Sequence, residues 1–137
     1  AWWDYNSDGL LDLYMGNMMC WDNWTSYKDV VFQNAGDGQF VEVSGSEGFS
    51  KLRHSTRGAA PADANGDGHT DLMVNNYTLH PNLYFQSTGT GEVEELAKES
   101  GLEGQANYSG TTRYYGHTIG AAWGDLDNDD RAGRAGC

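Results

Sequence analysis

Aspartate residues gather in three short clusters that recur at a nearly constant distance along the chain. Ten of the thirteen Asp residues lie in these clusters, which begin at Asp4, Asp63 and Asp125 and are therefore spaced 59 and 62 residues apart. The first two clusters read Asp4-Tyr-Asn-Ser-Asp8-Gly9-Leu-Leu-Asp12 and Asp63-Ala-Asn-Gly-Asp67-Gly68-His-Thr-Asp71. Self-similarity at a fixed period is the signature of a repeated structural unit. The sequence therefore predicts a repeat protein.

The similarity extends beyond the acidic clusters. Gly58-Ala-Ala-Pro-Ala-Asp63 matches Gly120-Ala-Ala-Trp-Gly-Asp125, and the segment 32–40 aligns with the segment 85–93. We expect a first repeat at 1–57, a second at 58–119, and the start of a third at 120–137. The stretches 16–27 and 103–115 differ between repeats and are the natural places for loop insertions.

Each repeat carries four strand signals. Leu11, Leu13 and Met15 alternate with other residues in a period of two, and the segments 30–32 and 40–43 flank a Gly-rich turn, which is typical of a hairpin. An apolar stretch such as 118–123 precedes each acidic cluster, and only 96–100 favours a helical turn. Four short strands per repeat predict an all-β fold of β-propeller-type blades, each with four antiparallel strands.

The acidic clusters have the spacing of a calcium loop. Oxygen donors occupy positions 1, 3, 5 and 9, a backbone carbonyl is available at position 7, and glycine at position 6 permits a sharp turn. Ca²⁺ accepts six to eight oxygen ligands, whereas Mg²⁺ demands a stricter octahedron. An EF-hand is excluded because it needs Glu at position 12, where Met15 and Val74 stand. The alternative is that these are ordinary Asx turns between strands.

These motifs resemble the FG-GAP/VCBS repeat family, whose blades form calcium-binding β-propellers. The resemblance rests on the Gly120–Asp129 segment and on the hairpin Phe32-Gln-Asn-Ala-Gly-Asp-Gly-Gln-Phe40. It implies calcium ligands at Asp4, Asn6, Asp8, Leu10 (carbonyl) and Asp12, and at Asp63, Asn65, Asp67, His69 (carbonyl) and Asp71.

The third loop departs from this pattern. It supplies Asp125, Asp127 and Asp129, but Asp130 replaces the glycine at position 6 and Gly133 replaces the carboxylate at position 9. We therefore expect no complete third calcium site.

The charge of the chain excludes several partners. Eight Lys and Arg against twenty Asp and Glu give a formal net charge of −12, which disfavours nucleic acid and anionic membrane surfaces. No apolar run approaches the roughly 20 residues of a membrane span, so we expect no membrane insertion. Calcium loops of this kind suit a compartment with millimolar calcium, so we expect an extracellular or periplasmic location.

Other residues offer weaker indications. Trp21, Trp24 and Tyr27 form an aromatic group, which is either a sugar-stacking surface or, as is more common, loop packing. His54 and His117 precede equivalent glycines, which favours a structural role over catalysis. Sequons at Asn23, Asn76 and Asn107 would permit glycosylation in a secreted glycoprotein.

Two functions compete. The first is a non-enzymatic, calcium-stabilised extracellular module for adhesion, ligand display or assembly; the second is a carbohydrate-binding or carbohydrate-processing propeller domain. No Ser-His-Asp order, P-loop, Cys/His zinc cluster or dinucleotide fingerprint is present in the sequence. Since a closed propeller typically needs four to eight blades, we expect a fragment of a longer propeller or a protomer that assembles with neighbouring copies, with a glycan or protein as a further partner.

Overall fold

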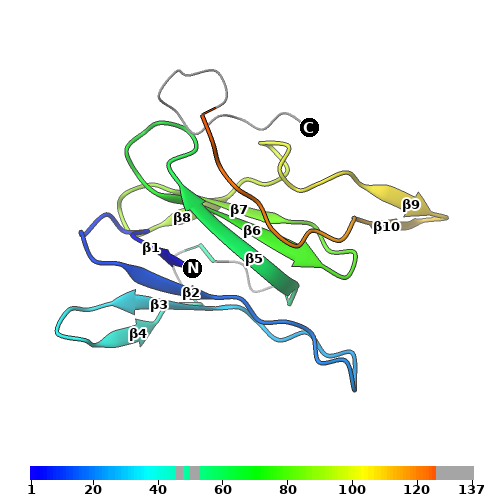
Figure 1. Cartoon of the computed structure of the whole chain (residues 1–137), viewed down its shortest axis with the longest axis horizontal. Coiled ribbons are helices and arrows are strands. Elements are labelled where there is room, and N and C mark those ends of the chain that lie inside the picture. The colour runs from blue at the N-terminus through cyan, green and yellow to red at the C-terminus, as the bar shows by residue number, and fades with distance from the viewer. Residues whose placement is uncertain (46–47, 50–52, 126–137) are drawn as a thin grey trace.

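The computed structural model describes residues 1–45, 48–49 and 53–125 and contains two four-stranded antiparallel sheets (Figure 1). The first sheet has the order β1-β2-β3-β4. Its strands are β1 (Trp2–Trp3), β2 (Asp12–Met15), β3 (Val30–Asn34) and β4 (Phe40–Glu42). The turn between β3 and β4 is the expected Gly-rich hairpin, closed by a hydrogen bond from the Ala35 amide to the Gln39 carbonyl.

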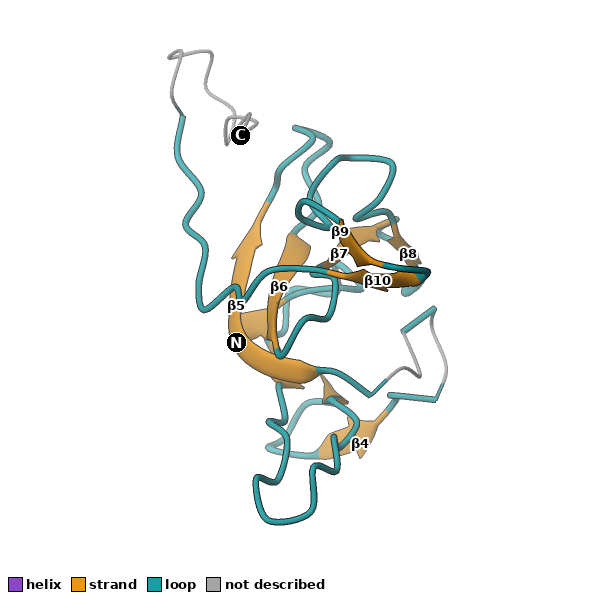
Figure 2. Ribbon diagram, turned by 90° about the vertical axis from the view of Figure 1, so that its right-hand side faces the viewer, coloured by secondary structure: helices purple, strands orange, loops and turns teal. Residues whose placement is uncertain are grey.

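The second sheet repeats this order as β5-β6-β7-β8. Its strands are β5 (Ser55–Ala62), β6 (Asp71–Tyr77), β7 (Leu83–Ser87) and β8 (Val93–Glu95). Equivalent residues pair in both sheets, since Trp2 faces Leu13 across β1 and β2 just as Pro61 faces Leu72 across β5 and β6. The two-sheet arrangement is visible from the side in Figure 2. The expected all-β fold with sheets of four antiparallel strands is confirmed.

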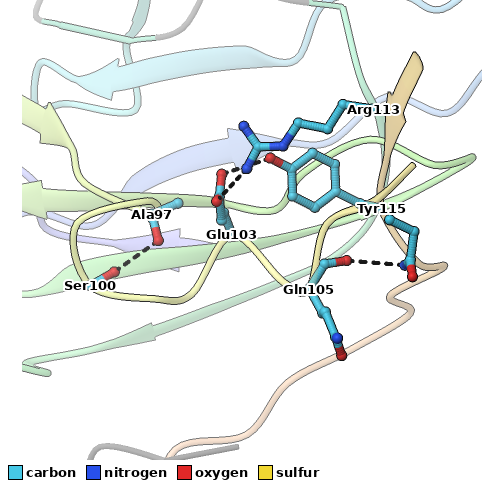
Figure 3. Close-up of polar contacts among 7 residues, drawn as sticks. Ala97, Ser100, Glu103, Gln105, Arg113 and Tyr115 are labelled. Atoms are coloured by element: carbon cyan, nitrogen blue, oxygen red, sulfur yellow. Dashed lines mark hydrogen bonds and ion pairs between the residues drawn. The ribbon is translucent and has the colours of Figure 1, made fainter. Parts of the chain in front are cut away.

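A third hairpin, β9 (Asn107–Ser109) with β10 (Thr112–Tyr114), projects from the two sheets (Figure 1). Its base is tied to the preceding loop by Glu103, which is paired with Arg113 at 2.8 Å and accepts a hydrogen bond from the Tyr115 hydroxyl at 2.8 Å (Figure 3). In the same loop Ser100 donates to the Leu96 carbonyl at 2.7 Å and to the Ala97 carbonyl at 3.3 Å. The expected turn at 96–100 is therefore a single hydrogen-bonded turn, and the described residues contain no helix.

The main hydrophobic core lies between the two sheets. Its buried members from the first sheet and its loops include Trp3, Tyr5, Tyr14, Val31 and Phe49, and from the second sheet Leu72, Val74, Leu83, Phe85 and Val93. The rings of Phe49 and Phe85 meet edge to face with centroids 5.6 Å apart. Because neither sheet can bury this face alone, each sheet depends on the other for its stability.

The far face of the second sheet carries a second, smaller core. Met73, Tyr84 and Ala97 are buried there, and Trp123 packs against them with its ring centroid 6.3 Å from that of Tyr84. Trp123 also donates from its indole nitrogen to the Ala60 carbonyl at 2.9 Å. The segment that follows β10 therefore returns along β5.

The strand expected at 118–123 is not formed. In both complete sheets the equivalent strand pairs with the strand that follows the acidic loop, β1 with β2 and β5 with β6. For 118–123 the corresponding segment falls within 126–137, outside the described residues.

The described part of the chain also contains no helix of the length and apolarity that a membrane span requires.

Candidate functional site

The first acidic loop, between β1 and β2, is folded around the side chain of Asp4. The Asp4 carboxylate accepts hydrogen bonds from the amides of Asp8 at 3.1 Å and Gly9 at 3.0 Å. Asn6 accepts a second bond from the Asp8 amide at 3.2 Å and donates to the Asp8 carboxylate at 2.9 Å. The Asp8 carboxylate in turn accepts from the Leu10 amide at 2.8 Å.

The second acidic loop, between β5 and β6, repeats these contacts and adds one, from the Gly66 amide to the Asp63 carboxylate at 2.7 Å. The Asp63 carboxylate accepts from the amides of Asp67 at 3.1 Å and Gly68 at 2.8 Å. Asn65 and Asp67 are joined at 2.7 Å, and Asp67 accepts from the His69 amide at 2.8 Å. This agreement, position by position, shows that the two acidic sequences encode one loop conformation.

Glycine at position 6 is required by that conformation. Gly9 and Gly68 adopt φ values of +84° and +89°, in the left-handed region that glycine enters without steric cost. This turn directs the amide of the glycine back onto the first Asp of the loop. Asp130 occupies the same position of the third loop but lies outside the described residues.

The Asp at position 9 differs from the others because it is fully buried. Asp12 accepts from the amides of Tyr5 at 3.2 Å and Asn34 at 2.8 Å, and Asp71 accepts from those of Ala64 at 3.1 Å and Ser87 at 3.0 Å. Asp71 also accepts from the Tyr84 hydroxyl at 2.6 Å. Burial raises the pKa of both Asp12 and Asp71. These two carboxylates therefore fasten each loop to the third strand of its own sheet.

The two loops also touch each other. The Ser7 hydroxyl and His69 Nδ1 are hydrogen-bonded at 2.8 Å, and the Ser87 hydroxyl donates to the carbonyl of Tyr5. Both loops lie at the same end of the stacked sheets, on the left in Figure 1. The structure thus brings the ten residues predicted for the first two loops into neighbouring turns, whereas Asp127 and Asp129 of the third lie outside the described residues.

The donor set of each loop fits a hard cation such as Ca²⁺. Asp4, Asn6 and Asp8 present only carboxylate and amide oxygens, and a carboxylate oxygen that accepts one amide bond keeps a further lone pair. Desolvation alone would raise the pKa of Asp67, but the hydrogen bonds from His69 and Asn65 outweigh it and lower that pKa. Among the described residues, no group of three or more His, Cys, Asp or Glu side chains is already arranged to hold a metal ion.

A cavity of about 500 Å³ opens at the opposite end of the sheets. It is lined by residues from the connection between β2 and β3, the connection between β6 and β7, and the segment after β10: Met19, Trp21, Trp24, Ser26, Tyr77, Thr78, Leu79, His80 and His117. The sequence had indicated Trp21 and Trp24, which line the cavity; Tyr27 is exposed and is not among the lining residues. The residues at 77–80 were missed because the sequon that begins at Asn76 does not indicate a cavity and because the β6–β7 connection has no counterpart of the same sequence in the first repeat.

A chain of polar contacts runs from Tyr14 to His54, which packs on the cavity residue His80. The Asp29 carboxylate accepts from the Tyr14 hydroxyl at 2.5 Å and from the Thr56 hydroxyl at 2.6 Å, and Thr56 lies 3.0 Å from the Asn76 amide oxygen. Asn76 Nδ2 lies 3.0 Å from His54 Nδ1, and the ring of His54 packs on that of His80. Burial raises the pKa of Tyr14, and the Asp29 charge raises it further.

The expected structural role of the histidines agrees with these contacts. Desolvation, together with the neighbouring His80, lowers the pKa of His54 to about 4, so His54 is neutral at physiological pH. His117 accepts a hydrogen bond from the Thr78 amide at 3.1 Å and packs on the Tyr77 ring with centroids 4.3 Å apart.

Comparison with known proteins identifies one family. The sequence model described as an FG-GAP-like repeat matches residues 4–74, just over half of the chain, including both acidic loops. Cartilage acidic protein 1 from Xenopus tropicalis and from Homo sapiens are each 38% identical to this chain over 63 residues. That match covers 46% of this chain but only 10% of each relative, so the chain spans a small part of their length. No solved structure matches the chain.

Proposed function

Because the chain belongs to the FG-GAP-like repeat family, we propose that it is a calcium-binding, non-enzymatic extracellular repeat module that serves adhesion, ligand display or structural assembly. The observation that carries the proposal is the agreement between the two acidic loops. Two sequences that differ at four of their nine positions make the same set of backbone contacts, and the residues they share are the five that a cation loop needs.

In the first loop the calcium ligands proposed are Asp4, Asn6, Asp8, the Leu10 carbonyl and Asp12, and in the second Asp63, Asn65, Asp67, the His69 carbonyl and Asp71. Bound calcium would supply positive charge that offsets the repulsion between the carboxylates of each loop. The chain's own residues already determine the shape of the loop, because Asp4 and Asp63 collect the amides of the turn. Asp12 and Asp71 hold the loop against its sheet.

A further repeat is the partner that we propose for the outer face of the first sheet. Trp2, Met15 and Phe40 are 54%, 46% and 43% exposed on this face, and the rings of Trp2 and Phe40 lie 6.2 Å apart. Trp2 occupies in the first repeat the position that Trp123 occupies two repeats later, and Trp123 packs on the second sheet. A further repeat, from the same protein or from a neighbouring copy, would cover the first sheet in the same manner.

Two observations support an extracellular, non-catalytic role. The relatives are named for cartilage and for their acidity, and this chain carries a formal net charge of −12. The polar groups at the acidic loops are engaged in holding the loops closed, and the described histidines at the cavity contact aromatic rings and backbone. These contacts serve to hold the fold together, which is what a calcium-stabilised scaffold requires.

Thermal unfolding in the presence and absence of calcium tests the proposal. A ligand that binds only the folded state adds RT ln(1 + [L]/Kd), or about 2.7 kcal/mol at a hundredfold excess over Kd. We expect calcium to raise the melting temperature of the full chain, and we expect magnesium at the same concentration to raise it much less. Identical melting curves in calcium and in excess chelator would contradict the proposal.

A further inference from the structure

We propose that the cavity at the end of the sheets opposite the acidic loops is a binding site for an uncharged pyranose ring of a glycan. The cavity measures about 500 Å³, within the range of about 300–1,000 Å³ typical of small-ligand sites. Its residues come from three segments that are far apart in the sequence, around 19–26, 77–80 and 117. The site is separate from the acidic loops, which precede β2 and β6, whereas most of its lining residues lie in the connections that follow these strands (Figure 1).

Exposed aromatic rings form one corner of the cavity. Trp21 and Trp24 are 47% and 70% exposed, and their rings meet at 80° with centroids 5.7 Å apart. Tyr77 continues the wall, 6.5 Å from Trp21 at 76°. Rings at right angles expose both a flat face and an edge, so the C–H face of a pyranose can lie on one ring while its rim contacts the next. Because little of the Trp24 side chain is buried, burial of this ring contributes little to the stability of the fold.

The backbone around the cavity is strained. The described chain has five non-glycine residues with positive φ, and three of them line this cavity: Trp24 at 55°, Thr78 at 56° and Leu79 at 66°. A β-branched residue such as Thr78 rarely adopts this conformation, and strain of this kind concentrates at binding sites. Trp24, Thr78 and Leu79 lie in turns, as does Asp37. The positive φ values therefore mark the tight turns from which the wall of the cavity is built.

Polar groups without partners lie in the same wall. Thr78 Oγ1 and His80 Nδ1 are buried side-chain atoms with no hydrogen-bond partner in the described structure. Ser26 and His117 add further donors and acceptors, and His117 Nδ1 already accepts from the Thr78 amide, which leaves Nε2 to carry the proton. The Thr78 and His80 atoms are closed off from solvent, so the hydroxyl groups of a ligand would meet the more accessible polar groups of Ser26 and His117.

The charge of the wall selects a neutral ligand. No Asp, Glu, Lys or Arg is among the described residues that line the cavity, although the Arg57 guanidinium lies over the ring of the lining residue Tyr77, 4.9 Å from its centroid. An ammonium group would find no carboxylate among the lining residues, and an anion would find no cation among them. A purely apolar ligand would leave the polar groups of Ser26 and His117 against apolar surface. An uncharged saccharide satisfies both the aromatic and the polar parts of the wall.

The test is saturation-transfer NMR on the full chain, produced in a bacterial host so that it carries no glycan. The probes are methyl pyranosides of glucose, galactose, mannose, fucose and N-acetylglucosamine, with glycerol and the dye 1-anilinonaphthalene-8-sulfonate as non-saccharide probes. We expect saturation transfer to the ring protons of at least one pyranoside and no transfer to glycerol. Failure of every pyranoside at tens of millimolar, or binding of the aromatic, anionic dye alone, would overturn the proposal.

Substitutions locate the binding. Trp24→Ala should weaken the affinity for the bound pyranoside at least tenfold, and Trp24→Phe should weaken it less, because a smaller ring still stacks. Tyr108→Ala is the matched control, since Tyr108 is an aromatic residue of β9 that is 66% exposed and is not among the lining residues. It should leave the affinity unchanged within twofold. Pyranoside binding that Trp24→Ala does not weaken, in a variant with wild-type near-ultraviolet circular dichroism, would contradict this assignment.

The saccharide can come from two sources. The first source is a glycan attached to Asn23, an exposed sequon residue next to Trp24. The second source is a separate glycan. Protein from a eukaryotic host, with and without Asn23→Gln, separates the two. If the attached glycan is the occupant, the glycosylated protein will not bind the free pyranoside and the Asn23→Gln variant will; equal binding by both identifies a separate glycan.

Discussion

The two sheets have the same strand order, yet their equivalent faces meet different surroundings. Leu72, Val74 and Phe85 of the second sheet are buried against the first sheet. The residues in the same positions of the first sheet are Leu13, Met15 and Phe32, and they lie on its outer face, where Leu13 and Phe32 are only half-buried and Met15 is exposed. The same face of the repeat is thus core in one copy and surface in the other.

This difference shows that the sheets stack in one direction. Tyr14 and Val31, on the opposite face of the first sheet, contact the second sheet, whereas Met73 and Tyr84 in the same positions of the second sheet are covered by Trp123 from the next repeat. Each sheet therefore offers one face to the repeat before it and the other face to the repeat after it. Such an interface is heterologous and can be extended from both sides.

Truncation of the equivalent leucines should give the largest difference between the sheets. Leu72→Ala should lower the free energy of unfolding by about 3 kcal/mol, because Leu72 is fully buried and its removal leaves a cavity. Leu13→Ala should cost less than about 1 kcal/mol, because Leu13 is only partly buried. Urea unfolding of both variants measures the two values, and equal losses would contradict the stacking described above.

The two tryptophans at equivalent positions should differ less strongly. Trp123→Ala should cost about 2 kcal/mol, since it removes the contact with Tyr84 and the hydrogen bond to the Ala60 carbonyl. Trp2→Ala should change the stability of the isolated chain by no more than about 0.5 kcal/mol. It should, however, weaken any association between copies in sedimentation velocity experiments. A loss for Trp2→Ala as large as that for Trp123→Ala would mean that the outer face of the first sheet is already covered within the chain.

Acid should act on the second sheet rather than the first. Residues 1–53 contain no histidine, whereas burial beside His80 lowers the pKa of His54 to about 4. Between pH 6.5 and pH 4 the unfolded chain binds a proton that folded His54 does not, so stability should fall as the pH falls through this window. We expect His54 to account for about 1 kcal/mol of that fall.

Urea midpoints measured across this window for the wild type and for His54→Gln test the assignment. The variant should lose less stability over the window, because it has no group at this position that titrates. Parallel pH profiles for the two proteins would exclude His54 as the cause.

The sequons give a comparison that involves no change in stability. Asn23, in the connection that follows the first sheet's β2, is exposed, as is Asn107 in β9. Asn76, in β6 of the second sheet, is fully buried and donates from its amide to the Pro81 carbonyl at 2.7 Å. Secreted protein should therefore carry glycans at Asn23 and Asn107 only. Peptide mass spectrometry would detect occupancy at Asn76 if that residue were accessible.

The repeated parts of the fold could be predicted from the sequence. The alternation around Leu13 and the Gly-rich turn before Phe40 each have one structural solution, and both appear where expected. The identity of the two acidic loops followed from their shared spacing, because position 6 demands positive φ and position 9 a buried acceptor.

Other features depend on contacts that the sequence does not reveal. The β9–β10 hairpin lies in the stretch 103–115, which was expected to be a loop insertion; Gly110, with φ of +61° at a two-residue turn, was the available signal. The segment 118–123 has a strand-like sequence but no paired neighbour among the described residues. The cavity arises where three separate connections meet, so only its tryptophans were visible in advance.

The most direct test of the account is the number of calcium ions that the chain binds. Calorimetric titration of calcium-free protein should show one ion for each of the two complete loops. Asp8→Ala and Asp67→Ala should each remove one ion and leave the other in place, because equivalent residues hold the two loops. An unchanged number of ions in either variant, or no calcium uptake by the wild type, would contradict the claim that both loops are calcium sites.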